Sequence, residues 1–231
     1  FWQPFFDSPN PVTICVAHPK VYNIFGDEID QLVFTYRPGA TPRPDEKPVP
    51  GRVYSAVIIP EPYNFVGVGD AHALARLFAR FEAGRKACQI RRGNDMSFAE
   101  LRRSPSVLIG GYSNQWSLSQ LRELRYIVQP GLAILDQKEG KQVAAITRVL
   151  EGVPDSYVDY AIISRLIRSR TGEAMLGVVG LSHYGTMAAA ELVTDRPVLE
   201  STLREVPGWS PGRNCQIVLR VNVMIRAPEK P

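Results

Sequence analysis

Hydrophobic residues follow two patterns along this chain. Short continuous apolar runs, rich in β-branched residues, are typical of buried strands, whereas apolar residues spaced three and four apart are typical of helices that bury one face. The runs predict strands over residues 11–17, 31–36, 53–60, 87–93, 105–111, 125–130, 132–137 and 215–225, and two hairpins that turn at 139–140 and 171–172. The helical spacings predict helices over residues 67–86, 97–104, 117–124, 185–194 and 197–206.

Polar residues and glycines mark the ends of these helices. Asp70 is predicted to be the N-cap of the first helix, and Gly84 ends it. Ser97, with Glu100 three residues later, has the pattern of a capping box. Ser117 is predicted to cap the helix over 117–124.

Strands and helices alternate through the first half of the chain, at intervals of about 10–15 residues, which is the signal of parallel βαβ units. The predicted fold is therefore α/β, a three-layer, Rossmann-like mixed sheet with helices on both faces. Residues 12–17, 88–92 and 106–110 are expected to be parallel neighbours in one sheet, because segments of crossover length separate the latter two.

Composition is that of an ordinary globular protein. The 231 residues are 45% hydrophobic and 22% charged, so we expect one α/β domain over residues 1–231. Within it, residues 1–10 form an N-terminal arm and residues 37–51, rich in proline, form a surface loop. The net charge of +4 comes from 27 basic and 23 acidic residues spread along the chain. Nucleic-acid grooves concentrate their basic residues, so direct nucleic-acid binding by this segment is not expected.

Cys15, Cys88 and Cys215 each lie in an apolar, strand-like run without CxxC spacing. They are expected to be buried, unbridged thiols, in preference to a disulfide framework or a metal site. No stretch of about 18 apolar residues occurs, so no membrane span is expected in this sequence. The first residue is Phe1, and a membrane anchor upstream of it is compatible with the sequence.

Two segments, residues 107–121 and 177–192, share one pattern: an apolar strand, a glycine, a short polar loop and a helix start. Loops at the carboxyl ends of parallel strands bind ligands in open α/β sheets, glycine lets the backbone approach a ligand, and the first turn of a helix attracts anions. The sequence therefore predicts one small anionic or polar ligand in contact with both loops. The candidate ligand-binding residues are Gly110, Gly111, Ser113, Asn114, Ser182, His183, Gly185 and Thr186, with Tyr112 or Tyr184 as a stacking face.

Asn114 is expected to contribute most, because its amide both donates and accepts hydrogen bonds. Asn114→Ala is then expected to weaken ligand binding by about 1–3 kcal/mol and to leave the fold intact. The two loops are expected within about 10 Å of each other, the width of a small ligand.

Several alternatives stay open for the same residues. Gly110 and Gly111 also suit a tight turn, and Ser117 and Thr186 also suit helix caps. Neither loop matches GxGxxG or GxxxxGK[ST], so no dinucleotide or nucleotide cofactor is expected. A metal site would need the three histidines, His18, His72 and His183, to converge, but their spacing has no metal signature, and no metal is expected. A triad of Ser182, His183 and Asp95 lacks the G-x-S-x-G elbow.

Part of this sequence resembles uncharacterised α/β domains from soil bacteria of the acidobacterial type. The resemblance lies in residues 69–126 and 180–195, which include the asparagine-bearing Gly-Gly loop and the G-x-x-x-x-G-T-x-A-A turn. The resemblance covers roughly residues 1–225. Domains of this family often follow a single membrane span, sometimes with a winged-helix DNA-binding domain upstream. The resemblance implies a sensor or ligand-binding domain of a membrane-anchored regulatory protein. It leaves the side of the membrane open, is compatible with an extracytoplasmic domain, and supplies no family chemistry.

The sequence thus favours a non-catalytic domain that binds a small anionic or polar ligand and signals to an upstream segment. One alternative is an enzyme for a nucleotide- or sugar-like substrate, with Asp70, Asp95 or His183 as acid or base. Another is a protein-interaction module. A carboxylate or histidine buried in the crevice with a strongly shifted pKa would favour the enzyme. A crevice filled by Tyr112, Trp116 and Tyr184 would favour the interaction module.

Overall fold

The computed structural model describes residues 1–19, 21–25, 57–60, 65–130, 132–148 and 156–224. The chain divides into two compact units. Unit 1 comprises Phe1–Pro19 and Val66–Pro231, and unit 2 comprises Lys20–Phe65. The predicted strand over 31–36 and the predicted loop over 37–51 lie outside the described residues.

Unit 2 contains an antiparallel strand pair among its described residues. β2 (Tyr22–Phe25) pairs with β3 (Val57–Pro60), with Tyr22 opposite Pro60. β3 lies within the predicted strand over 53–60, which is confirmed in its described part.

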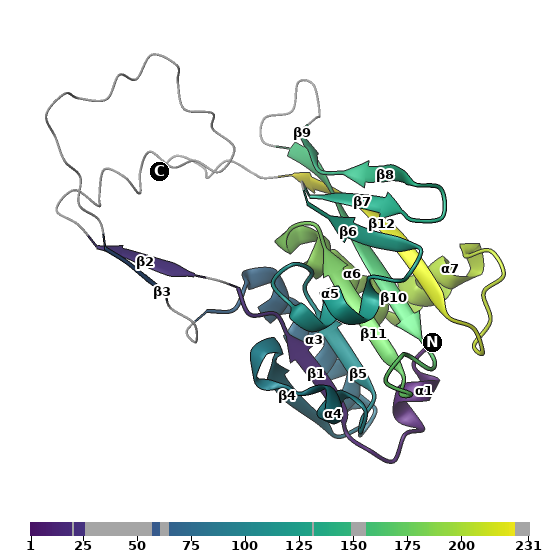
Figure 1. The fold of residues 1–231 in the computed structure, drawn as a ribbon. Coiled ribbons are helices and arrows are strands. Elements are labelled where there is room, and N and C mark those ends of the chain that lie inside the picture. The colour runs from purple at the N-terminus through teal and green to yellow at the C-terminus, as the bar shows by residue number, and fades with distance from the viewer. Residues whose placement is uncertain (20, 26–56, 61–64, 131, 149–155, 225–231) are drawn as a thin grey trace, which may run out of the picture. The chain divides into compact units, whose positions relative to one another are not determined.

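Unit 1 is built on a mixed sheet of order β12-β10-β11-β5-β1-β4, with β9 paired to β10 (Figure 1). β1 lies between β4 and β5 and is parallel to both, and β5 is parallel to β11. The predicted parallel set is therefore confirmed, with β1 in its centre. β10 runs antiparallel to both β11 and β12. The strands are β1 (Val12–Val16), β4 (Cys88–Arg92), β5 (Ser106–Ile109), β9 (Thr147–Arg148), β10 (Ser156–Leu166), β11 (Met175–Gly180) and β12 (Cys215–Met224).

A smaller antiparallel sheet consists of β6 (Tyr126–Gln129), β7 (Ala133–Asp136) and β8 (Lys141–Ala145). The hairpin predicted to turn at 139–140 is the β7–β8 pair, and the hairpin predicted at 171–172 is the β10–β11 pair. Both predictions are confirmed. The turn residues Gly140 and Gly172 have positive φ angles, which glycine adopts without steric cost.

The helices of unit 1 are α1 (Gln3–Phe6), α3 (Val68–Ala83), α4 (Phe98–Leu101), α5 (Gln115–Leu121), α6 (His183–Thr194) and α7 (Arg196–Glu205), with a 3₁₀ turn, η1 (Gly93–Asp95). The capping box of Ser97 and Glu100 is confirmed. Two predicted caps are wrong. Gly67, in extended conformation, caps α3, so that Asp70 lies inside the first turn. Asn114, not Ser117, caps α5.

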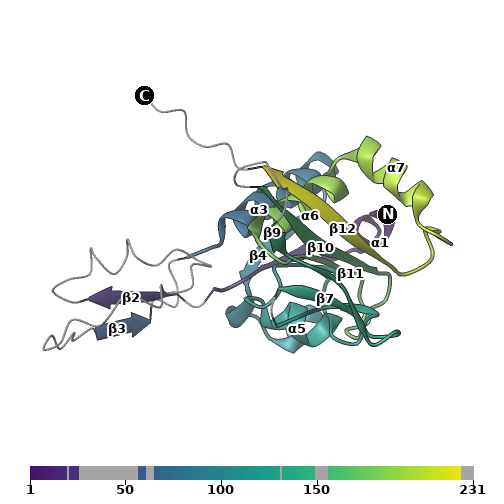
Figure 2. The ribbon, with the colours of Figure 1, turned by 90° about the horizontal axis from the view of Figure 1, so that it is seen from above.

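The hydrophobic core has separate clusters on the two faces of the main sheet. Val107 and Ile109 of β5 belong to one cluster and Leu108 to another, and successive side chains of a strand point to opposite faces. Residues of α3 and α6 complete the first cluster, and residues of α4 and α5 the second. Figure 2 shows α3, α6 and α7 on one side of the sheet and α5 with β7 on the other.

The N-terminal arm belongs to the core of unit 1. Trp2 Nε1 donates a hydrogen bond to the Val193 carbonyl of α6 at 3.0 Å, and Phe5 is fully buried. The Trp2 and Phe5 rings are in edge-to-face contact. The arm therefore packs on the core of unit 1.

Arg165, near the end of β10, is fully buried with carbonyl oxygens as its partners. Its Nε donates to Phe1 O at 2.7 Å, Nη1 to Arg213 O at 2.8 Å and Nη2 to Pro211 O at 3.0 Å. The guanidinium also lies over the Trp209 ring, 5.1 Å from its centroid. This one side chain therefore ties the arm and the loop before β12 to the sheet.

The three cysteines are free thiols. Cys15 is fully buried, and this burial raises the pKa of its thiol to about 12. Cys88 and Cys215 are half-buried, so the burial predicted for all three holds fully for Cys15 alone. Within the described residues, no helix has the length and apolar character that crossing a bilayer requires.

Candidate functional site

The loops that follow β1, β5 and β11 meet at one edge of the main sheet. The backbone N–H of His18, after β1, donates to the Ser113 carbonyl after β5 at 2.8 Å. A Cβ built on Gly111 would lie 3.8 Å from the carbonyl oxygen of Gly180, at the end of β11. The two glycine loops therefore lie side by side, as the parallel strand order predicts.

The first turns of α3 and α6 meet at the same edge. A Cβ on Gly69 would lie only 2.4 Å from the His183 carbonyl oxygen, so the two backbones approach as closely as glycine allows. Asp70, the next residue of α3, points toward the β5 loop. Its Oδ1 is 3.2 Å from the Cβ position of Gly110, and Ser113 Oγ is 3.5 Å from that position. We call Asp70, Gly110 and Ser113 the strand-end cluster.

Asp70 is a half-buried carboxyl group without a hydrogen bond or an ion pair among the described residues. Loss of hydration disfavours its charged form and raises the pKa of Asp70 to about 6. Gly110, with φ of +88°, adopts a backbone conformation that a residue with a side chain rarely takes. The loop can therefore pass close to the carboxyl group.

The shifted pKa of Asp70 makes stability depend on pH. The group ionises near pH 3.9 in an unfolded chain and near pH 6 in the folded protein. As pH rises, the unfolded chain releases this proton first, so the folded protein loses stability between about pH 4 and pH 6. Asp70→Asn removes that loss. We expect the variant to match the wild type at pH 4 and to exceed it by about 1–2 kcal/mol at pH 8, less than the full shift would give, because the group is half-exposed.

Urea unfolding at pH 4, 6 and 8 measures this difference. A constant difference between Asp70→Asn and wild type across these pH values would show that the two states share one pKa for Asp70.

Asn114 lies in the β5–α5 loop as a fully buried structural residue. Its Oδ1 accepts from the N–H groups of Trp116 at 3.0 Å and Ser117 at 3.4 Å. Its Nδ2 donates to the carbonyls of Ile109 at 2.9 Å and Cys15 at 3.2 Å. The amide caps α5 and joins β5 to β1, and both its donors and its acceptor are engaged. The amide thus has no group free for a ligand here, and the role of Asn114 as the main ligand contact stays a prediction.

The N-terminus of α6 already holds an anion, the carboxylate of Asp159 from β10. This side chain is fully buried. Its Oδ2 accepts from the Ser182 hydroxyl at 2.5 Å and from the Gly185 N–H at 2.6 Å. Thr186 Oγ1 bonds to the Gly180 N–H and to the Ser182 carbonyl, each at 3.2 Å. Because an internal carboxylate engages this turn, an anionic ligand at Ser182, Gly185 and Thr186 would have to compete with Asp159, and that ligand stays a prediction.

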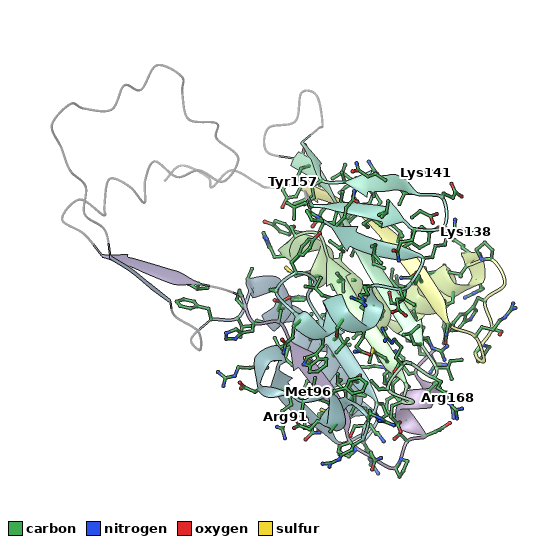
Figure 3. The ribbon with its side chains drawn as sticks, in the orientation of Figure 1. Arg91, Met96, Lys138, Lys141, Tyr157 and Arg168 are labelled. Atoms are coloured by element: carbon green, nitrogen blue, oxygen red, sulfur yellow. The ribbon has the colours of Figure 1, made fainter. Side chains whose placement is uncertain are left out.

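His183 remains exposed at this edge, beside two tyrosines. Its ring lies 4.0 Å from the Tyr184 ring, centroid to centroid, and Tyr184 meets Tyr157 of β10 edge to face at 5.9 Å. Figure 3 labels Tyr157, whose ring stands at the periphery of unit 1. The pKa of Tyr157 is raised, mainly by burial. These rings form a stacking surface next to the first turn of α6.

The aromatic residues proposed to fill the crevice are separately placed. Tyr112 is exposed. Trp116 donates from Nε1 to the Gly93 carbonyl at 2.8 Å and stacks on Phe98, away from the Tyr184 cluster. The feature that would favour a protein-interaction module is therefore not seen among the described residues.

The imagined nucleophile triad is not formed. The Ser182 hydroxyl donates to Asp159, and Asp95 forms an ion pair with Arg92 at 2.5 Å. His72 Nε2 lies 3.1 Å from Glu191 Oε1, which joins α3 to α6. In the part of the chain that the structure describes, no group of three or more His, Cys, Asp or Glu side chains has a metal-binding arrangement.

Asp159 is the residue of this edge that the sequence reasoning missed. It stands within the apolar run of residues 156–166. A carboxylate inside a buried strand needs strong hydrogen-bond donors, and the first turn of a helix supplies them. A charged residue within an apolar strand was therefore the signal in the sequence that could have pointed to Asp159.

The structure thus changes which polar groups at this edge are available to a ligand. Asn114 and Asp159 satisfy the first turns of α5 and α6, whereas the carboxyl group of Asp70 has no partner among the described residues. Comparisons with protein-family models, with curated proteins and with solved structures found no match to this chain.

Proposed function

We propose that unit 1 is a non-catalytic binding domain for a small polar ligand that carries hydrogen-bond donors and contacts Asp70 in the strand-end cluster. The observation that carries this proposal is the Asp70 carboxyl group, half-buried and without a partner among the described residues. Ionisable groups held in surroundings that shift their pKa concentrate at functional sites. Structural carboxylates in this unit, such as Asp159 and Asp136, have donors.

The scaffold supports binding at this position. We infer a three-layer, Rossmann-like arrangement in which β1 leads toward α3 on one face and β5 leads to α5 on the other. Neighbouring parallel strands whose connections leave to opposite faces create the place where α/β proteins bind ligands. Gly110 and Gly111 let a ligand approach the backbone there, and the Ser113 hydroxyl adds a donor and an acceptor.

The chemistry of the available groups selects the ligand class. The N–H groups of the α6 and α5 first turns that would bind an anion are engaged by Asp159 and Asn114. Asp70 accepts hydrogen bonds when ionised, so amines and polyols complement it better than phosphates or carboxylates. The exposed ring of His183, whose backbone lies against Gly69 of α3, offers a planar surface at the same edge of the sheet.

The binding proposal predicts a pH-dependent affinity. A thermal-shift screen of amines, polyols and nucleosides identifies a ligand, and calorimetry then measures its Kd at pH 5 and pH 7.5. With a pKa near 6, Asp70 is ionised in about a tenth of the molecules at pH 5, so binding is expected to be about tenfold tighter at pH 7.5. Asp70→Asn should abolish this pH dependence and weaken binding at pH 7.5.

Asp95→Asn, an exposed carboxyl change after β4, serves as the matched control and should bind like wild type. Equal affinities of wild type and Asp70→Asn at pH 7.5 would reject Asp70 as a ligand contact. A screen with no ligand in any of the three classes would reject the ligand class.

A second candidate function is acid–base catalysis by Asp70, which the raised pKa of this half-buried carboxyl group favours by the criterion set out from the sequence. A carboxyl group with a pKa near 6 has the proton affinity that a general acid or base needs near neutral pH. The test is chemical conversion of any bound nucleoside or sugar, followed by product analysis. Conversion that is lost in Asp70→Asn and half-maximal near pH 6 would favour the enzyme over the binding domain.

The sensor role is part of our proposal and depends on the resemblance to domains that follow a membrane span. In that role, ligand binding at Asp70 changes the contacts of unit 1 with an upstream segment. A full-length protein whose regulatory output responds to the identified ligand in wild type, and not in Asp70→Asn, would support it.

A further inference from the structure

A cavity of about 50 Å³ lies between α5, β6 and the main sheet. Its walls are largely aliphatic, with Leu121 from α5, Val128 from β6 and Val179 from β11. One enclosed water needs about 10–15 Å³ by this measure, so the cavity has room for a chain of about three to five carbon atoms. Gly111 lines it too, but none of the strand-end cluster does.

Ser117 brings a polar group to this apolar lining. The residue is 4% exposed, and its Oγ has no hydrogen-bond partner among the described residues. A buried hydroxyl without a partner is unfavourable, and buried polar groups in proteins are nearly always hydrogen-bonded. Ser117 is therefore a residue of the cavity wall whose hydroxyl has no partner of its own among the described residues.

Arg122 supplies the charge. It is the one charged residue among the described residues that line the cavity, it is exposed, and its guanidinium has no ion pair or hydrogen bond within the described chain. Arg122 directly follows α5, and Ser117 lies within α5 on the same wall. An apolar chamber with a hydroxyl inside and a guanidinium at its exposed side complements a molecule with an aliphatic tail and an anionic head.

We propose that this cavity binds a short aliphatic carboxylate, of about four to six carbons in total, as a second site separate from Asp70. The aliphatic tail lies among Leu121, Val128 and Val179. The carboxylate accepts a hydrogen bond from Ser117 and pairs with Arg122. Apart from Gly111, which lies beside both sites, this assignment uses other residues than the proposed function, and its test does not depend on Asp70.

The test is calorimetric titration of the full chain with isovalerate, with isovaleramide as the neutral probe of the same shape. Wild type is expected to bind isovalerate saturably and at least fivefold more tightly than isovaleramide. Ser117→Ala and Arg122→Gln should each weaken isovalerate binding at least fivefold. Ser117→Ala should fold normally, because it removes a buried group without a partner.

Arg102→Gln, a change of an exposed arginine just after α4, is the matched control for lost charge and should bind isovalerate like wild type. Asp70→Asn should do the same. Absence of saturable binding to wild type would show that the cavity holds water only. Equal affinity in Ser117→Ala and Arg122→Gln, or equal affinity for isovaleramide, would overturn the proposed site.

Discussion

Asp159→Ala is expected to lower the free energy of unfolding by about 3–4 kcal/mol. The Asp159 carboxylate accepts from the Ser182 hydroxyl and from the N–H groups of Gly185 and Tyr160, at 2.5, 2.6 and 2.7 Å. Hydrogen bonds to a charged group contribute about 1.5–3 kcal/mol, and donors left buried without a partner add to the loss. A chain of this size should then unfold about 10 °C lower, measured by circular dichroism.

Anion rescue makes this prediction specific. Asp159→Ala removes the internal carboxylate from the first turn of α6 and leaves space beside its N–H groups, so added formate should raise the melting temperature of this variant more than that of wild type. Asp159→Asn keeps the volume and should lose about 2 kcal/mol without rescue. Asp195→Asn, at the N-cap of α7, is the matched control, because asparagine caps as well as aspartate.

A melting temperature of Asp159→Ala equal to that of wild type would contradict the anchoring role of the carboxylate. Equal formate responses of the two proteins would show that the first turn of α6 is not an anion site in this setting.

Asn114→Ala is expected to lower the free energy of unfolding by about 3 kcal/mol. The change removes an N-cap, which costs about 0.5–2 kcal/mol. It also leaves the carbonyls of Ile109 and Cys15 without the amide that bonds them in a fully buried position, and each such loss costs about 1–3 kcal/mol when water cannot replace the partner. This expectation reverses the one drawn from sequence, in which the fold stays intact.

Ser97→Ala provides the comparison, because Ser97 caps α4 at an exposed position. Water can replace its hydroxyl there, so the loss should be about 1 kcal/mol. Denaturant unfolding followed by tryptophan fluorescence measures both variants. If Asn114→Ala costs no more than Ser97→Ala, the bonds to Ile109 and Cys15 contribute nothing beyond the cap.

Local sequence was sufficient for most of the described strands and helices, but not for the short elements α1 and β2. The apolar runs at 12–16 and 106–109 became the parallel strands β1 and β5, because a strand buried on both faces needs apolar side chains on both. The segment 88–92 became the partly exposed strand β4, which pairs with β1. The capping box at Ser97 and the turn at Gly172 were also readable, since each is formed by residues close in sequence. From the parallel order followed the meeting of the two glycine loops at one edge.

Tertiary structure alone decided which polar groups at that edge are available. Asp159 is 26 residues from Gly185 and Asn114 is 99 residues from Cys15, so no local pattern shows that these pairs meet. The same holds for Arg165, whose partner Phe1 is 164 residues away. Whether a buried polar group is satisfied depends on which distant group packs against it. For this reason the sequence predicted that the two glycine loops meet at one edge, but it did not show that the amide of Asn114 is engaged within the fold. Only the fold left Asp70 as a carboxyl group of that edge without a partner among the described residues.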